Sequence, residues 1–346
     1  MDNKRRKFLT AATGSILIAP SLLPTSALGY ENINNSVLLS EFDDVQSLLN
    51  NNIRVLILNP EVVYQWSNIS LPSGTSIIGN GATIKTTSLT FPIIKIDEHS
   101  TNIIIKDVRF DGDVSTPINM PVQATHIGIE VYKASNITIE GCDFKNFLGT
   151  GISTFNYTGQ KMSSAIQVRG CRFIACQYGF TAWYNCEYGI LEGCHFTECR
   201  AAIFICSGNW LVTGNIVVKC RASYIATNLA NEIAFSTGGN FSHGNVSNNT
   251  FNHSNDSPWA ATPLQAGTTF ENIAGIYFKN VLPVTFTGNA LWYTDINISN
   301  IEDDFYFTGC TLSNNTIKVA GTSKVYLSGC WIRASVNYNN NDVIVH

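Results

Sequence analysis

The sequence has little charge, and beyond its first residues it lacks any basic run. Only 13% of its 346 residues are Asp, Glu, Lys or Arg, and the formal net charge is −4. Removing residues 1–29 as a leader takes away four of the 21 basic residues and one of the 25 acidic ones. That leaves 17 basic and 24 acidic residues and a net charge of −7. A mildly acidic protein without a basic patch suits the phosphate backbone of nucleic acid poorly, so no nucleic-acid partner is expected.

The sequence also lacks an apolar run long enough for a stable membrane span. The most apolar stretch near the start, residues 8–23, is broken by Gly14 and Pro20 and follows four basic residues at positions 4–7. A basic segment, a short apolar segment and then small residues are typical of a signal peptide, which we predict over residues 1–29. We therefore expect no stable membrane insertion.

The arginine pair within this leader indicates a route of export. Arg5 and Arg6, followed by Lys7, Phe8 and Leu9, resemble the twin-arginine signal of bacteria. The resemblance implies that the Tat export machinery is a partner and that the mature protein is periplasmic or secreted. An ordinary Sec leader is the alternative.

No linker-like stretch divides the rest of the chain, so we predict a single domain over residues 30–346. The chain has ten cysteines, and an even number in an exported protein usually suggests disulfides. Twin-arginine export carries proteins that have already folded in the reducing cytoplasm, where no disulfide is required for folding.

What the sequence does have is an internal repeat with a period just above 20 residues. Each unit is a short alternating strand, a Gly-Cys or Gly-Asn turn and a second short strand, without helical periodicity. The pattern predicts a parallel β-helix, in which each repeat is one coil stacked on the next. Copies of the strand-turn-strand unit begin at Ile105, Ile139, Val168, Leu191, Val212, Val246, Phe286, Phe307 and Leu327.

Charged residues at equivalent positions support this register. At two sets of outward positions the charge of the side chain alternates in sign from coil to coil. Opposite charges on neighbouring strands stabilise a sheet by roughly 0.2–1 kcal/mol per pair. The first set is Lys106, Glu140, Arg169 and Glu192, and the second is Arg109, Asp143, Arg172 and His195.

The repeat resembles the right-handed parallel β-helix of the pectate-lyase-like and tailspike-like superfamily, over roughly residues 50–346. The resemblance implies an all-β fold, a single-stranded right-handed parallel β-helix with a short N-terminal capping helix. Residues Ser40–Asn50 suit that helix, because they form an amphipathic pattern with Ser40 as the N-cap. The Gly79-Asn80-Gly81 segment is predicted to be a turn, because no lysine or helix follows as a phosphate loop would require.

The resemblance implies fold more strongly than activity. The superfamily contains lyases, hydrolases, epimerases, adhesins and inactive scaffolds. The paired aspartates and Arg-Ile-Lys of polygalacturonases, the calcium-binding acidic set of pectate lyases and the Asp-Pro-His motif of alginate epimerases are not found in this sequence. Pectin and alginate chemistry are therefore disfavoured, and we expect no cofactor.

In related β-helices a groove for sugar follows one sheet, and five segments align as its strands: residues 128–132, 151–155, 179–183, 202–206 and 275–279. Alternation sends their apolar residues inward and several aromatic residues outward, where rings stack on sugars. Four insertions, at residues 111–125, 146–164, 221–240 and 253–272, are predicted to leave the same position in the coil and to wall this groove. They could instead fold over the rings and bury them. The substrate-binding candidates are Tyr132, Phe155, Trp183, Phe204, Tyr277 and Lys279.

Catalytic candidates follow from two reaction types. A glycoside hydrolase needs two carboxylates, about 5–5.5 Å apart for retention or about 6.5–9.5 Å apart for inversion. Glu130 is the carboxylate on the aligned strands, and Glu232 and Asp256 are candidates for its partner. A lyase instead needs a cation for the substrate carboxylate and a base for the adjacent proton, which Lys279 with Tyr277 or Tyr184 could supply.

The segment Gly193–Cys199 at first suggests a zinc site, because His195 follows Cys194 and Cys199 lies close by. The repeat argues against zinc, because Cys194 belongs to an inward set of turn residues and His195 to an outward charged set. Ligands on opposite sides of a coil cannot share a metal, so no metal is expected. The inward turn residues are Cys142, Cys171, Cys194, Asn215, Asn249, Asn289, Cys310 and Cys330, and a second inward set is Cys176, Cys199 and Cys220.

Three functions stay open at this point. The first is an exported carbohydrate-active protein that binds and cleaves or modifies a polysaccharide as a lyase or glycoside hydrolase. The second is a non-catalytic polysaccharide-binding protein of exopolysaccharide assembly. The third is a structural or adhesin β-helix.

Overall fold

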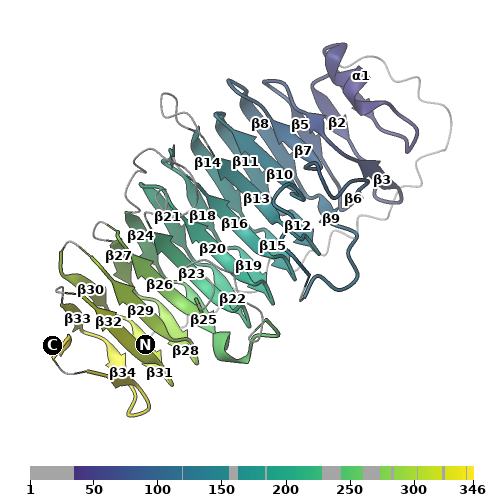
Figure 1. Ribbon diagram of the computed structural model, residues 1–346. Coiled ribbons are helices and arrows are strands. Elements are labelled where there is room, and N and C mark those ends of the chain that lie inside the picture. The colour runs from purple at the N-terminus through teal and green to yellow at the C-terminus, as the bar shows by residue number, and fades with distance from the viewer. Residues whose placement is uncertain are drawn as a thin grey trace, which may run out of the picture. The chain divides into compact units, whose positions relative to one another are not determined.

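The computed structural model describes residues 35–346, except residues 119, 156–162, 184, 228–242, 260–272, 282–283, 302, 322–323 and 340. These residues form stacked coils whose strands join three sheets, and every strand pair is parallel (Figure 1). A coil passes through sheet 1, then sheet 2, then sheet 3, and continues into the next strand of sheet 1. The predicted parallel β-helix is therefore confirmed. The predicted leader lies outside the described residues.

Sheet 1 consists of β1 (Ser36–Leu38), β2 (Val55–Ile57), β5 (Ser76–Ile78), β8 (Thr101–Lys106), β11 (Ser135–Glu140), β14 (Ser163–Arg169), β17 (Cys186–Glu187), β18 (Ile190–Glu192), β21 (Trp210–Thr213), β24 (Gly244–Ser247), β27 (Val284–Thr287), β30 (Phe305–Thr308), β33 (Val325–Ser328) and β36 (Val343–Val345). Sheet 2 consists of β3 (Val63–Trp66), β6 (Thr83–Thr86), β9 (Arg109–Asp111), β12 (Asp143–Lys145), β15 (Arg172–Ile174), β19 (His195–Thr197), β22 (Ile216–Val218), β25 (Thr250–Asn252), β28 (Ala290–Trp292), β31 (Thr311–Ser313) and β34 (Trp331–Ile332). Sheet 3 consists of β4 (Ile69–Ser70), β7 (Ile94–Ile96), β10 (Ile129–Tyr132), β13 (Thr150–Phe155), β16 (Tyr178–Ala182), β20 (Ala201–Ile205), β23 (Ala222–Thr227), β26 (Gly275–Lys279), β29 (Ile296–Ser299), β32 (Thr316–Ala320) and β35 (Asn337–Tyr338).

The core is built from residues that repeat at the same position in successive coils. Phe110, Phe144, Phe173 and Phe196 are in register on sheet 2, and their rings stack with centroids 4.6–5.1 Å apart. The turn before these strands needs a residue whose backbone is in the left-handed conformation, and Gly141 adopts it with φ +64°. The Gly-Cys-x-Phe repeat of the sequence therefore encodes one turn and one core layer per coil.

The inward turn positions behave as predicted. All ten cysteines are free thiols, and those of the two predicted inward sets are buried except for the half-buried Cys330. In the middle coils the Asn215 side-chain amide donates to Asn249 Oδ1, and that of Asn249 donates to Asn289 Oδ1, each at 2.9 Å. A buried amide needs such partners, and stacking provides them because the same side chain recurs one coil away.

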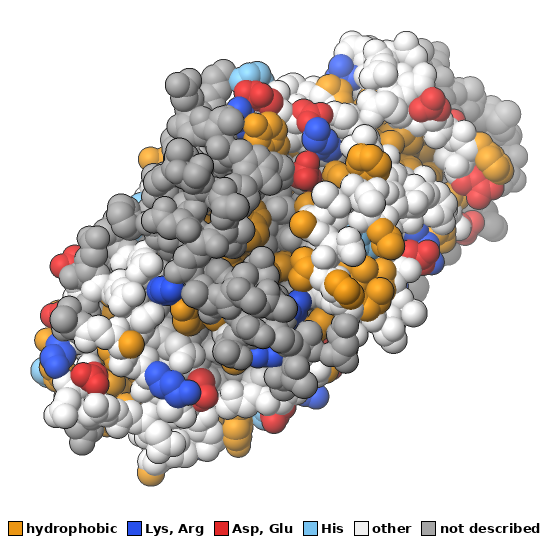
Figure 2. Space-filling view, in the orientation of Figure 1, with side chains coloured by type: hydrophobic (Ala, Val, Ile, Leu, Met, Phe, Trp, Pro, Cys, Tyr) orange, Lys and Arg blue, Asp and Glu red, His pale blue; other side chains and the backbone are white. Residues whose placement is uncertain are grey.

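The outward charges also pair as predicted. Lys106 Nζ lies 2.8 Å from Glu140 Oε2, and Arg169 Nε lies 3.2 Å from Glu192 Oε2. Arg172 holds both carboxylate oxygens of Asp143, and His195 follows it in the register. The face in Figure 2 likewise shows basic and acidic side chains interspersed rather than separated.

The N-terminal helix is present but begins later than predicted. Helix α1 (Val45–Asn50) is capped by Asp44, whose carboxylate accepts from the Ser47 N–H at 3.0 Å. Ser40 is therefore not the N-cap; its own N–H donates to Asp43 Oδ2. The helix buries Val45 and Leu49 in the core. No helix among the described residues is long and apolar enough to cross a membrane.

The prediction that all insertions leave one position of the coil is wrong. Residues 112–128 and 253–274 run from sheet 2 to sheet 3, whereas residues 156–162 and 228–243 run from sheet 3 to sheet 1. Part of the predicted insertion 221–240 is itself the sheet 3 strand β23, between β20 and β26. The connections therefore leave sheet 3 along both of its edges.

Candidate functional site

The outer face of sheet 3 carries Glu130 and the described binding candidates that the sequence indicated. Register places one outward residue from each successive strand in a continuous line across this face. The line begins polar and becomes apolar: Ser70, Lys95, Glu130, Ser153, Thr181, Phe204, Ile225 and Tyr277.

The polar end of the line is built around Asp97, just beyond β7. Lys95 Nζ lies 2.8 Å from Asp97 Oδ1, and Ser70 Oγ donates to Asp97 Oδ2 at 2.5 Å. The side chains of Lys95 and Asp97 are 38% and 40% exposed, so the ion pair remains accessible from solvent. Strand alternation puts all three residues on the outer face, because Ile94 and Ile96 point into the core.

Glu130 lies beside this pair on β10, directly next to Lys95 in the register. Burial raises the pKa of Glu130, and Asp97 adds to that shift while Lys95 opposes it. Burial also tends to raise the pKa of Asp97, but its bonds from Lys95 and Ser70 outweigh burial and lower it. The two carboxyl groups are thus shifted in opposite directions. We call Ser70, Lys95, Asp97 and Glu130 the carboxylate cluster.

Two carboxyl groups with diverging pKa values can divide the work of an acid and a base. The more basic group, Glu130, holds its proton longer and can donate it, while Asp97 remains ionised. Lys95, whose pKa is raised chiefly by its bond to Asp97, contributes a fixed positive charge next to both. The next two residues of the line are also polar but buried, and Thr181 Oγ1 donates to Ser153 Oγ at 3.1 Å.

Glu130 was predicted as a site residue from the sequence, whereas Ser70, Lys95 and Asp97 were not. A signal was present: Ile94-Lys-Ile-Asp97 alternates in the same way as Ile129-Glu-Val-Tyr132. The alignment of groove strands began one coil too late to include it.

The other end of the line forms a second apolar cluster on the outside of the sheet. Its buried members are Ala201, Phe204, Cys206, Ala222, Ile225 and Ile273, and Tyr178, Trp183 and Tyr277 pack against them. Phe204 is only 2% exposed and touches Trp183, with ring centroids 4.7 Å apart. The expectation of an open aromatic stripe is therefore wrong at Phe204, because its neighbours enclose the ring.

The remaining predicted binding residues keep some exposure where the structure describes them. Tyr132, Trp183, Tyr277 and Lys279 are half-buried on the outer face of sheet 3. Lys133 Nζ lies 5.0 Å from the centre of the Tyr132 ring. Phe155 ends β13 opposite Tyr132 in the register, but its side chain is outside the description.

The predicted partners of Glu130 are not brought to it. Asp256 lies in the 3-10 helix η2 (Ser254–Asp256), where its carboxylate is 2.6 Å from His253 Nδ1. Five strand steps separate β10 from β26, the sheet 3 strand that follows η2, which is about 24 Å. Asp256 therefore cannot pair with Glu130. Glu232 and Tyr184 lie outside the described residues.

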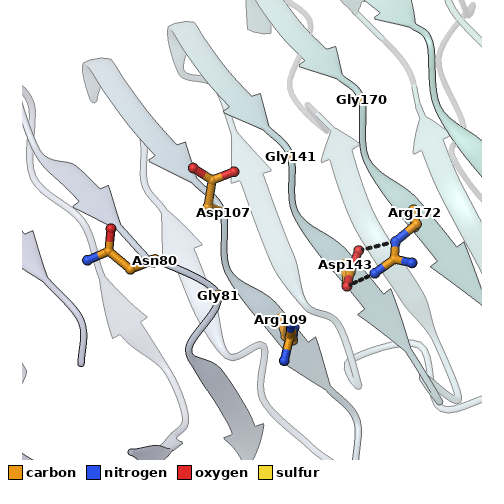
Figure 3. Close-up of a pocket in the computed structure, with 8 residues that line it drawn as sticks. All are labelled: Asn80, Gly81, Asp107, Arg109, Gly141, Asp143, Gly170 and Arg172. Carbon is orange, nitrogen blue, oxygen red and sulfur yellow. Dashed lines mark hydrogen bonds and ion pairs between the residues drawn. The ribbon is translucent and has the colours of Figure 1, made fainter. Parts of the chain in front are cut away.

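A separate groove crosses the corner between sheets 1 and 2 (Figure 3). It has a volume of about 380 Å³ and exists because Gly141 and Gly170 place no side chain between the coils. It is lined by Asn80, Gly81, Asp107, Arg109, Gly141, Asp143, Gly170 and Arg172. The Asp143–Arg172 ion pair occupies one end, and no titratable group lining this groove is buried. Within the described part of the chain, no set of His, Cys, Asp or Glu is arranged to hold a metal ion.

Comparison with known proteins places this chain among β-helix proteins. A family model described as Adenovirus EB1 55K protein / large t-antigen matches residues 19–338. No curated protein sequence matches the chain.

Two solved structures are similar in fold. One is the catalytic domain of a GH87 alpha-1,3-glucanase variant in complex with tetrasaccharides, with a TM-score of 0.51, 12% identity, and coverage of 90% of this chain and 67% of that chain. The other is a tailspike protein variant of E. coli bacteriophage HK620 in complex with pentasaccharide, with a TM-score of 0.53 and 15% identity. The tailspike match covers 86% of this chain and 64% of that chain. At these identities the likeness shows the fold alone.

Proposed function

The chain belongs to the Adenovirus EB1 55K protein / large t-antigen family, and we propose that its β-helix binds a polysaccharide along sheet 3 and cleaves or modifies it. The family description names a viral protein and no reaction. Substrate class, chemistry and export therefore rest on this chain's own residues. The similar folds that hold tetrasaccharides and a pentasaccharide make a glycan compatible with this architecture.

The observation that carries the proposal is the carboxylate cluster. Asp97 and Glu130 sit on neighbouring coils of one accessible face, and their pKa values are shifted in opposite directions. Strand spacing and a two-residue offset put their Cα atoms about 8 Å apart. Side chains on backbones this far apart can hold their carboxyl groups on either side of a water molecule, and the proposal takes that arrangement, which is the one of an inverting glycoside hydrolase.

In this mechanism Glu130 is the general acid, and Asp97 is the base that activates water. Tyr132, at the edge of the cluster, offers a ring on which a sugar could stack. Lys95 holds Asp97 ionised and could also face the carboxylate of an acidic sugar. A lyase reaction is the alternative chemistry, in which Lys95 would neutralise the carboxylate of the substrate.

The test is turnover by the purified chain on a panel of neutral and acidic polysaccharides. Reducing ends are expected from hydrolysis and unsaturated products from elimination. Glu130→Gln and Asp97→Asn should each lower turnover at least about 100-fold, by removing the acid or the base. The matched control is Glu140→Gln, which breaks an ion pair on sheet 1 and should leave turnover unchanged. Equal activity in all three variants would reject the assignment.

A non-catalytic polysaccharide-binding protein is the second candidate, and one observation favours it. Both oxygens of Asp97 are already engaged, one by Lys95 and one by Ser70, which leaves that carboxylate less available to activate water. This function predicts glycan binding by affinity electrophoresis, weakened by Tyr132→Ala, with no product from any polysaccharide. Product formation would exclude it.

Export is tested independently of the substrate. Residues 1–29 fused to a reporter that folds in the cytoplasm should direct the reporter out of the bacterial cytoplasm. The double change R5K/R6K should block this export, so that the reporter stays in the cytoplasm. Export that ignores this double change would instead favour the Sec route.

A further inference from the structure

Arg200 is a buried cation that forms no ion pair with any of the described residues. It lies at the corner between β19 and β20 and is 4% exposed. Its guanidinium Nη1 donates to Gln177 Oε1 at 2.7 Å, and the amide of Gln177 in turn donates to the Met120 carbonyl at 2.8 Å. Its Nε is buried and has no hydrogen-bond partner. A buried donor left unbonded destabilises the folded state, and more so when it is charged.

A second arginine lies at the same position of the next coil. Arg221, 8% exposed, donates to the Trp259 carbonyl at 2.9 Å and to the Ile273 carbonyl at 3.3 Å. The coil spacing puts the two backbones about 4.8 Å apart. Burial lowers the pKa of Arg200, and Arg221 lowers it further while Tyr178 opposes the shift. In the described part of the chain no carboxylate forms an ion pair with Arg200.

We propose that Arg200 binds a small monovalent inorganic anion, of the size of a halide, held within the corner between sheets 2 and 3. Such an ion accepts the hydrogen bond that Arg200 Nε lacks and offsets the repulsion from Arg221. Desolvation strongly destabilises an unpaired buried ion, so the compensating charge has a large effect.

The surroundings restrict the size of this ligand. Gln177, Ala201 and Ala222 next to Arg200 are fully buried, so little surface remains for a sugar or a peptide. Tyr178 can supply a second donor, because burial raises its pKa to about 12, against the effect of Arg200, and its hydroxyl therefore keeps its proton. Space rather than geometry favours a compact anion, because a carboxylate would bring its carbon skeleton into a corner whose neighbouring residues are fully buried.

The bound ion would act as a structural link along sheet 3. Gln177, Arg200 and Arg221 come from three successive coils, and their bonds reach the segments that contain Met120, Trp259 and Ile273. Those segments belong to the two long connections between sheets 2 and 3. The proposal is independent of polysaccharide chemistry, and so is its test.

The test is thermal unfolding of the full chain in sodium chloride and sodium bromide against sodium gluconate, at one ionic strength. Gluconate is too large to enter, so it controls for screening. Raising chloride or bromide from about 10 to about 200 mM should raise Tm by roughly 2–4 °C, because the ion binds only the folded state. Arg200→Met should remove this response. Arg172→Met, which alters an exposed arginine on sheet 2, should keep it.

Equal Tm values in gluconate and halides for the unchanged protein would overturn the proposal, and so would a halide response that survives Arg200→Met. If Arg200→Met does not fold, a crystal of the unchanged protein grown in bromide decides the matter. An anomalous peak within hydrogen-bond distance of Arg200 Nε supports the site, and no peak there rejects it.

Discussion

The outer face of sheet 3 has two halves that occupy equivalent strand positions but differ in chemistry. In the first coils the line of outward residues contains Lys95, Glu130 and Ser153, next to a solvent-accessible ion pair. In the middle coils the same line continues through Phe204 and Ile225, which are buried in an apolar cluster. Alternation along the strand sent both sets away from the core in the same way.

The difference shows that pointing outward and being exposed are separate properties of a β-helix residue. Alternation decides only whether a side chain enters the coil interior. Exposure depends on which residues pack over the sheet, such as Ile273, whose carbonyl accepts from Arg221 and whose side chain is buried in the apolar cluster. An aromatic outward residue is thus a binding candidate only where the connections leave it open.

The largest contrast between the halves is expected in stability. Phe204→Ala should lower the free energy of unfolding by about 3–5 kcal/mol, because it leaves a cavity in the apolar cluster. Tyr132→Ala, in the polar half, should cost only about 1 kcal/mol, since that ring is half-exposed. Urea unfolding of both variants measures the contrast, and equal losses would show that the halves are enclosed to the same degree.

His126 should make the protein sensitive to acid. It lies in the connection of residues 112–128, which leads into the polar half of sheet 3. Its ring is fully buried, its Nδ1 accepts from the Leu148 N–H, and burial lowers its pKa to about 4. A lowered folded-state pKa stabilises the protein above the unfolded value near 6.5, and that stability is lost as pH falls towards 4. The loss should reach about 3 kcal/mol.

Urea unfolding between pH 8 and pH 4 follows this effect. His126→Gln should flatten the pH dependence, whereas His195→Gln, at an exposed position, should leave it unchanged. If the free energy of unfolding of His126→Gln still falls with pH as in the unchanged protein, other groups cause the acid sensitivity.

Within the polar half, the two carboxyl groups should respond to pH with opposite signs. Asp97, whose pKa is lowered, contributes stability above its unfolded pKa and loses it as pH falls. Glu130, whose pKa is raised, contributes stability at low pH and loses it as pH rises. Relative to the unchanged protein, Asp97→Asn should therefore become less stable as pH rises through the range below about 4, and Glu130→Gln should become more stable as pH rises above about 4.5. Thermal unfolding at several pH values tests this prediction. If the Tm differences of both variants from the unchanged protein change with pH in the same direction, the pKa values of Asp97 and Glu130 are not shifted in opposite directions.

The smallest effect is expected from an ion pair at the surface. Arg172→Ala removes the bidentate pair with Asp143 at the corner groove, where the Arg172 side chain is 57% exposed. Exposed ion pairs are worth about 0.2–1 kcal/mol, so the loss in urea should lie within that range and shrink in high salt. A larger loss would mean that surface pairs hold these coils together more than the apolar layers do.

Much of the fold was predictable because neighbouring coils repeat one pattern. The Gly-Cys-x-Phe unit places a left-handed turn residue, an inward thiol and a core ring at fixed intervals, so register follows from sequence spacing. The helix start was harder, because both Ser40 and Asp44 can cap a helix and only packing of Val45 and Leu49 against the core decides between them.

The candidate site was only partly predictable. Glu130 could be found because it is an outward carboxylate on an alternating strand. Its association with Lys95, Asp97 and Ser70 depends on contacts between three coils, and those residues lie 33 to 60 positions away in the chain. Asp256 looked equally suitable in sequence, but the coils place it on a distant part of the stack.

The sequence by itself determined the β-helix, its coil length, its inward layers and the alternating charges on its surface. These features repeat, and a repeated strand can satisfy its hydrogen bonds and bury its apolar face only by stacking in register on its copy. The tertiary structure alone decided which outward residues are covered, which carboxylates share an environment and which arginine is buried with no ion pair to the described residues. Those outcomes depend on the connections between sheets, which do not repeat and whose paths no periodic pattern encodes.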